Sequence, residues 1–298
     1  MPETLAVVGL GGMGAGAARR LLEQGYRVTV WNRTAEKATP LVEQGAEAAN
    51  SPGEAAAGAG VVITFLADDA ALEGVVLGPQ GIAARLGPGR VHLSMSTVSP
   101  VTARTLADAH QANGSAYVAA PVFGRPDAAA AGQLWIVTSG AADAKAKARP
   151  VLDALGQGVR DFGDDPVAAH VVKLAGNFLI AAASEAMAEA YTLGEKCGLD
   201  RMQLAEFFGA SLFPSRIYQH YGRLIAEHRY EPPGFKLRLG LKDMRLVLGT
   251  ADAHAMPMPL ASLLHDRLLA LAAQGHGEID WTGIGLAVAK EAGAAPPS

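Results

Sequence analysis

The residues with the clearest chemical meaning lie near the start of the chain and give the spacing G-x-G-x-x-G. They follow an apolar run, residues 5–9, that is typical of a strand, and they begin an Ala-rich stretch that is typical of a helix. In this context the first glycine allows a tight turn, the second lets the backbone approach a pyrophosphate, and the third lets helix and strand pack closely. Free N–H groups at the helix N-terminus then face the anion. The residues that we predict to bind a dinucleotide here are Gly9, Leu10, Gly11, Gly12, Met13 and Gly14.

The residues after the next strand indicate which nicotinamide cofactor is used. An NAD enzyme usually has Asp or Glu there, to accept a hydrogen bond from the ribose 2′-hydroxyl. This chain has Asn32, Arg33 and Thr34 instead. Arg33 can pair with a 2′-phosphate through its planar guanidinium, and Asn32 and Thr34 can donate hydrogen bonds to it. We therefore predict NADP(H) in preference to NAD(H).

A third candidate is the pair Lys173 and Asn177. Positions i and i+4 share one face of a helix. Carbonyl reduction needs a group that gives a proton to oxygen, and a partly desolvated lysine can have its pKa lowered enough for that role. His170 would share this face and could contact substrate, although a packed or solvated histidine is the alternative. A lysine on a helix is by itself an ordinary surface residue, so its assignment depends on further evidence.

These residues need a scaffold, and the first half of the chain alternates β-rich runs with helical stretches. We predict strands at residues 5–9, 27–31, 61–66, 90–95, 117–120, 134–138 and 159–162. Helices are predicted near residues 12–24, 35–44, 69–76, 99–113 and 141–155. This order, with nearly continuous apolar strands, predicts an α/β fold with a Rossmann-type, doubly wound parallel sheet covered on both faces.

After residue 164 the pattern becomes purely helical. Asp165-Pro166 is a good helix start, and a long helix should run from there to about Lys196. Asp200 should begin the next helix, and helical patterns follow near residues 215–227, 236–253, 259–274 and 281–291. We therefore predict an NADP-binding domain over residues 1–164. An all-α substrate and dimerisation domain should cover residues 165–298 and begin with the long interdomain helix.

Composition excludes several other classes. A formal net charge of −4 and a pI near 6.1 argue against nucleic-acid partners. No run reaches the ~20 apolar residues of a membrane span, and the N-terminal residues lack a signal-peptide pattern. The single cysteine, Cys197, and eight histidines without an H-E-x-x-H pattern indicate no metal site. We expect a cytoplasmic enzyme that acts on a small molecule, with no membrane partner.

Several motifs together resemble the β-hydroxyacid dehydrogenase family, which includes 3-hydroxyisobutyrate dehydrogenase and the glyoxylate/succinic semialdehyde reductases. In order along the chain they are the glycine turn, Ser94-Met95-Ser96-Thr97-Val98-Ser99-Pro100, Ala120-Pro121-Val122, the Lys173/Asn177 pair and Leu241-Lys242-Asp243.

The resemblance implies roles for individual residues. Lys173 would be the catalytic acid/base, with Asn177 beside it. Ser96 and Thr97 would contact the substrate and the nicotinamide ribose, and Lys242 would reach the cofactor. Leu66 and Ala67 match positions that line the cofactor. The resemblance also implies a homodimer, and a substrate held between the carboxyl edge of the sheet and the long helix.

The chain departs from the family in the loop after the fifth strand. It has Phe123, Gly124 and Arg125 where the family commonly has a serine and two glycines that hold the substrate carboxylate. Arg125 could supply the anion contact itself. Alternatively, Phe123 makes the pocket more apolar, and the substrate is not a simple hydroxyacid.

Phe123 and the absence of a Gly-x-Gly before Lys173 look similar to imine reductases, relatives that usually lack the lysine. Lys173 favours an NADP(H)-dependent dehydrogenase or reductase acting on CH–OH and C=O groups. An NADPH-dependent imine reductase and a non-catalytic dinucleotide-binding module are the alternatives.

Overall fold

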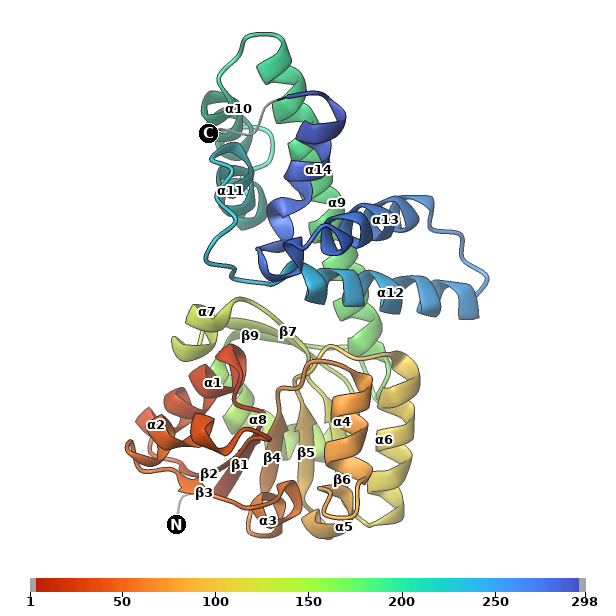
Figure 1. The fold of residues 1–298 in the computed structure, drawn as a ribbon. Helices are drawn as coiled ribbons and strands as arrows, with labels where there is room; N and C mark the ends of the chain where they lie inside the picture. The colour runs from red at the N-terminus through yellow and green to blue at the C-terminus, as the bar shows by residue number, and fades with distance from the viewer. Residues whose placement is uncertain (1–3, 295–298) are drawn as a thin grey trace. The chain divides into compact units, whose positions relative to one another are not determined.

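A computed structural model describes residues 4–294, and a six-stranded parallel sheet forms the centre of its N-terminal half (Figure 1). The strand order is β3-β2-β1-β4-β5-β6, in which the chain order reverses beside β1. The predicted Rossmann-type fold is therefore confirmed. The strands are β1 (Thr4–Val8), β2 (Arg27–Trp31), β3 (Glu47–Ala48), β4 (Val61–Thr64), β5 (Val91–Ser94) and β6 (Ala116–Ala119).

The apolar strands are buried on both faces. Side chains alternate across a strand, so Leu5 and Val7 of β1 join one core cluster, whereas Ala6 and Val8 join another. Helices α1 and α8 contribute to the first cluster, and α3 to α6 contribute to the second. The helices are α1 (Gly12–Glu23), α2 (Thr39–Val42), α3 (Pro52–Ala57), α4 (Asp69–Leu77), α5 (Ala83–Leu86), α6 (Pro100–Ala112), α7 (Pro126–Ala130) and α8 (Ala142–Leu155).

A second, three-stranded sheet follows the main sheet. It consists of β7 (Val122–Phe123), β8 (Leu134–Thr138) and β9 (Gly156–Asp161), in the order β7-β8-β9. Strand β7 pairs antiparallel with β8, which pairs parallel with β9. We expected β8 and β9 to continue the parallel sheet. Instead, the chain reverses after Pro121, and an isolated antiparallel bridge, Ala119 to Ser139, joins the two sheets. A two-residue strand such as β7 has too short a pattern to be recognised in the sequence.

The rest of the described chain is helical, which confirms the predicted all-α region. Asp200 accepts a hydrogen bond from the backbone N–H of Gln203 at 2.8 Å and so begins α10, as predicted. A core formed around Tyr191, Leu237, Met244 and Leu264 joins these helices. They are α9 (Ala168–Lys196), α10 (Arg201–Ala210), α11 (Gly222–Ala226), α12 (Leu237–Ala253), α13 (Pro259–Ala273) and α14 (Ile284–Glu291).

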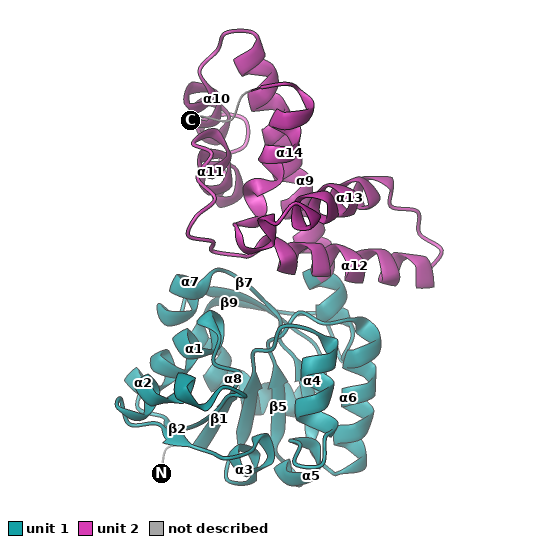
Figure 2. Cartoon of the chain, viewed as in Figure 1, with its two compact units in different colours: residues 1–173 teal, residues 174–298 magenta. Residues whose placement is uncertain are grey.

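The chain divides into two compact units, residues 1–173 and 174–298 (Figure 2). The division falls within α9, whereas the sequence places the domain boundary before this helix. The first turns of α9 belong with the N-terminal unit because Ala169 is buried in its core. By length and composition α9 could also cross a membrane, but a buried core helix has the same properties.

Candidate active site

The glycine turn between β1 and α1 has the geometry that a dinucleotide requires. Gly9 has a φ of +95°, and a side chain there would overlap the carbonyl oxygen of Phe65. A side chain at Gly14 would overlap the carbonyl oxygen of Gly9. By contrast, no atom lies within 4 Å of a side chain added at Gly11, which begins α1 without a side-chain cap. The fold itself therefore leaves open the space at the helix N-terminus that a pyrophosphate would use.

Asn32 connects the end of β2 to this turn. Its Oδ1 accepts a hydrogen bond from the backbone N–H of Leu10 at 2.9 Å, and its Nδ2 donates to the carbonyl oxygen of Thr34 at 2.9 Å. The amide thus organises the backbone on both sides of the predicted 2′-phosphate position. Arg33 and Thr34 are exposed at the end of the strand.

Ser96 joins the loops that follow β4 and β5. Its Oγ accepts a hydrogen bond from the backbone N–H of Leu66 at 2.8 Å and lies 3.4 Å from the carbonyl oxygen of Thr64. Ser96 is buried, Leu66 and Thr97 are half-buried, and Ala67 is exposed. Because the Ser96 hydroxyl supports the Leu66 backbone, these loops have a fixed geometry at the carboxyl edge of the sheet.

Lys173, on the second turn of α9, lies beside Phe123 of β7. Its Nζ is 4.2 Å from the centroid of the Phe123 ring, and the residue is 8 % exposed. The face of an aromatic ring attracts a cation, so this contact holds the Lys173 ammonium over the ring. Phe123, the residue that departs from the family pattern, is therefore in direct contact with the predicted acid/base.

The two residues after Phe123 are placed by backbone requirements. Gly124 has a φ of +148°, and a side chain there would come within 2.7 Å of a Leu134 methyl group. Arg125 is half-buried and precedes the first residue of α7. Arg125 therefore lies on the same loop as Phe123, whose ring contacts Lys173.

His170 is fully buried. Its Nε2 lies 3.0 Å from the hydroxyl of Tyr117 on β6, and the two rings are stacked. This contact fits the alternative of a packed histidine. Tyr117, which the sequence did not identify, connects the helix turn before Lys173 to the main sheet.

Asn177 and Lys242 share one partner within the helical unit. Asn177 Nδ2 donates a hydrogen bond to Asp243 Oδ2 at 2.6 Å, and Lys242 Nζ lies 2.8 Å from Asp243 Oδ1. Asp243 is only 1 % exposed. Its carboxylate therefore orients two predicted site residues, and we had assigned Asp243 no role from its motif. Asp243 could have been recognised in the sequence as a carboxylate next to Lys242 on the apolar face of the predicted helix.

A buried histidine pair joins β5 to α6 and was not predicted. His92 Nδ1 is 2.9 Å from His110 Nε2, and hydrogen bonds to Thr64 and Ser115 extend the pair at its two ends. Burial lowers the pKa of His92 well below its usual value and the pKa of His110 to about 4. Both rings are therefore neutral at pH 7.

No group of three or more His, Cys, Asp or Glu side chains within residues 4–294 is arranged to hold a metal ion.

Two protein-family models match successive parts of the chain. The NAD binding domain of 6-phosphogluconate dehydrogenase matches residues 4–165. The model described as NAD-binding of NADP-dependent 3-hydroxyisobutyrate dehydrogenase matches residues 167–288. Together they cover both the doubly wound and the helical regions.

Similar proteins match over nearly their whole length. An uncharacterized oxidoreductase of Bacillus subtilis, YfjR, is 43% identical over 280 residues, covering 94% of this chain and 98% of that protein. The 3-hydroxyisobutyrate dehydrogenase of Pseudomonas aeruginosa is 36% identical over 281 residues, covering 92% and 93%.

Solved structures give the same result. A 3-hydroxyisobutyrate dehydrogenase from Salmonella typhimurium has a TM-score of 0.86 and 28% identity, covering 96% of this chain and 99% of that one. An imine reductase from Pseudomonas has a TM-score of 0.66 and 25% identity, covering 96% and 99%.

Proposed function

Because the chain belongs to the β-hydroxyacid dehydrogenase family of oxidoreductases, we propose that it transfers a hydride between NADP(H) and a small hydroxyacid or semialdehyde, with Lys173 as the acid/base. The observation that carries this proposal is the position of Lys173. Its amine lies against Phe123, in the same compact unit as the glycine turn.

In the proposed reaction each group has a separate task. The nicotinamide cofactor, when bound, would supply the hydride for reduction of the substrate carbonyl. The Lys173 ammonium donates its proton to the carbonyl oxygen, so that an alcohol forms, and in the reverse direction the neutral amine accepts that proton. The Phe123 ring restricts where the amine can lie, and a positioned proton donor is more effective than a mobile one.

The preference for NADP(H) rests on the end of β2. Arg33 is exposed there, and no carboxylate occupies the three positions after the strand that could repel a 2′-phosphate. One matching family model is also described as NADP-dependent. Residues outside the glycine turn that would line or bind the cofactor are Asn32, Thr34, Leu66, Ala67, Thr97 and Lys242.

The substrate class depends on the Phe123 loop. Ser96 already uses its hydroxyl to support the Leu66 backbone, and Phe123 cannot donate to a carboxylate. Arg125, on the same loop, is then the proposed contact for the substrate anion. The preferred substrate would have an apolar segment beside Phe123 and a separate acid group beside Arg125. His170 and Gly124 would affect the substrate site indirectly. His170 would do so through its contact with Tyr117, and Gly124 through the turn that it allows after Phe123.

We also place the protein in the cytoplasm as a homodimer without nucleic-acid or membrane partners. Its net charge of −4 supports the absence of nucleic-acid binding. Exposed leucines of α9, Leu179 and Leu193, support the association of two helical units.

A substrate screen that follows NADPH absorbance tests the proposal. Succinic semialdehyde, glyoxylate, longer keto acids and cyclic imines should be compared side by side, and we expect at least one carbonyl acid to be reduced faster than every imine. Reduction of imines alone would support the imine reductase alternative, whose fold this chain shares. NADPH binding without any turnover would support a non-catalytic module.

A further inference from the structure

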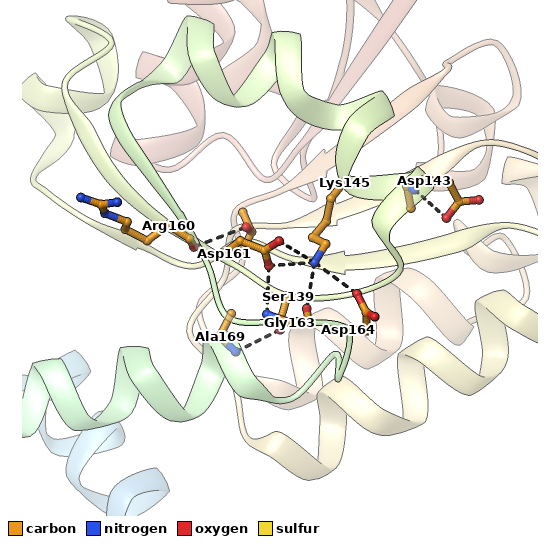
Figure 3. Close-up of polar contacts among 10 residues, drawn as sticks. Ser139, Asp143, Lys145, Arg160, Asp161, Gly163, Asp164 and Ala169 are labelled. Atoms are coloured by element: carbon orange, nitrogen blue, oxygen red, sulfur yellow. Dashed lines mark hydrogen bonds and ion pairs between the residues drawn. The ribbon is translucent and has the colours of Figure 1, made fainter.

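The segment between β9 and α9 precedes the helix that carries Lys173, and it is bonded by the half-buried ammonium group of Lys145 (Figure 3). Lys145 Nζ, on α8, lies 2.7 and 2.8 Å from the two carboxylate oxygens of Asp161, and donates to the carbonyl oxygen of Gly163 at 2.9 Å. Asp164 is more distant, at 3.4 Å. The Lys145 side chain is only 11% exposed. An ammonium has three protons to donate, so this group is well satisfied where it lies.

A second contact fixes the first turn of α9 itself. The first four N–H groups of a helix have no partner within the helix. The N–H of Ala169 donates to Ser139 Oγ at 3.0 Å, and both residues are fully buried (Figure 3). The backbone of Ser139 is paired with Ala119 at the end of β6. Ser139 therefore joins the start of α9 to the main sheet.

The direction of the Lys173 side chain follows from this contact. Ala169 and Lys173 are four residues apart and lie on one face of α9. A hydrogen bond that fixes the rotation of the helix at Ala169 also fixes the direction in which Lys173 points. The segment before α9 is restrained as well, because Lys145 bonds both Asp161 and Gly163.

We propose that Lys145 and Ser139 are positioning residues for the Lys173 amine, and that they act through the start of α9. This inference rests on the proposed acid/base role of Lys173. Loss of the Lys145 ammonium would free the segment at residues 161–164, and the amine would then spend less time over the Phe123 ring. A displacement of about 1 Å can slow a reaction about 100-fold.

The test compares variants with a matched control on the same helix. Lys145→Met removes the ammonium but keeps most of the side-chain length, and Lys145→Arg restores a cation with several donors. Lys147→Met is the control, since Lys147 lies on the same helix and also donates to a backbone carbonyl, but to that of Gly89 before β5. Ser139→Ala removes the acceptor of the Ala169 N–H. Each variant is assayed with NADPH and the fastest substrate of the screen.

We expect Lys145→Met and Ser139→Ala to lower kcat by about 10- to 100-fold, with NADPH affinity changed by no more than about twofold. Lys145→Arg should recover most of the lost kcat. The limb of the kcat–pH profile that reports Lys173 should move in Lys145→Met, because the amine loses its fixed surroundings. Amide hydrogen exchange at residues 167–173 should accelerate in the protein without cofactor. Lys147→Met should show none of these changes.

Two results would overturn the proposal: a kcat and pH profile in Lys145→Met that match those of Lys147→Met, or unchanged amide exchange at residues 167–173. If Lys145→Met does not fold, Asp161→Asn removes the charge on the other side of the pair and is judged by the same criteria. Lys173→Ala separates a failure of the proposed function from a failure of the positioning role. Full activity in that variant contradicts the proposed function, whereas a slow Lys173→Ala beside a fully active Lys145→Met contradicts only the positioning role.

Discussion

Gly11 and Gly14 are both glycines of the cofactor turn, but the fold requires only Gly14. We expect Gly11→Ala to fold normally, since its side chain meets no atom within 4 Å, and to weaken NADPH binding by about 10-fold or more. Gly14→Ala should lower the free energy of unfolding by about 1–3 kcal/mol, because its side chain overlaps the Gly9 carbonyl oxygen. Thermal unfolding and NADPH fluorescence titration measure the two effects. Unchanged NADPH affinity in Gly11→Ala would argue against a pyrophosphate at this position.

Arg33 is the residue that separates the two nicotinamide cofactors. Arg33→Ala should weaken NADPH by about 10- to 100-fold, the usual contribution of a hydrogen-bonded charge pair, and should leave NADH nearly unaffected. Arg27→Ala is the control, because Arg27 is also exposed but begins the same strand at its other end. Binding constants for both cofactors are measured by fluorescence titration. Equal losses for NADPH and NADH would remove the basis of the cofactor preference.

The His92–His110 pair, between β5 and α6, makes the free energy of unfolding depend on pH. Unfolded histidines take up protons near pH 6.5, whereas the folded pKa of His110 is about 4 and that of His92 is well below its usual value. Between these pH values the unfolded state binds more protons. The free energy of unfolding should therefore fall as the pH decreases from about 6.5 to about 4, by up to about 1.4 kcal/mol per pH unit for each histidine.

Urea unfolding at a series of pH values checks this dependence. His110→Gln should unfold with a shallower pH dependence than the wild type over that range. His254→Gln is a suitable control, since His254 is exposed at the residue after α12 and its Nδ1 lies 2.9 Å from the carbonyl oxygen of Thr250. A slope in His110→Gln as steep as that in the control would show that the buried pair is not responsible.

At the scale of elements, the sequence was most informative where a pattern was long. Apolar strands such as β1 and β4, and the cap at Asp200, follow from local residue types. The separate sheet of β7, β8 and β9 does not, because its pairing depends on where the chain reverses after Pro121. Ser139 and Lys145 were missed for the same reason. Ser139 contacts the first turn of α9, and Lys145 contacts the segment before it, each from another part of the sequence. No local pattern marks such a contact.

At the scale of the whole molecule, the family and the fold class could be predicted because the motifs occur in order along nearly the full chain. The environment of Lys173 could not. The sequence shows that Phe123 replaces a serine, but only the structure brings its ring to 4.2 Å from the amine. Asp243 follows Lys242 in the sequence, but its hydrogen bond with Asn177 joins residues far apart in the chain and could not be predicted.

The assembly of the molecule gives a further prediction. Leu179 and Leu193 of α9 are 64% and 68% exposed in the single chain, which favours burial against a second copy. Light scattering should give twice the chain mass of 30.7 kDa, and Leu193→Asp should shift the protein toward a monomer. Val101→Asp, at an exposed apolar residue of α6, should remain dimeric. A wild-type monomer at micromolar concentration would contradict the proposed homodimer.

The most direct test of the acid/base role of Lys173 is the rate of hydride transfer in Lys173→Ala. It is measured in a single turnover with saturating NADPH and the fastest substrate of the screen. We predict a rate about 10²- to 10⁴-fold below that of the wild type, with NADPH binding nearly intact. A rate equal to that of the wild type would contradict it, since the amine beside Phe123 would then carry no proton in the reaction.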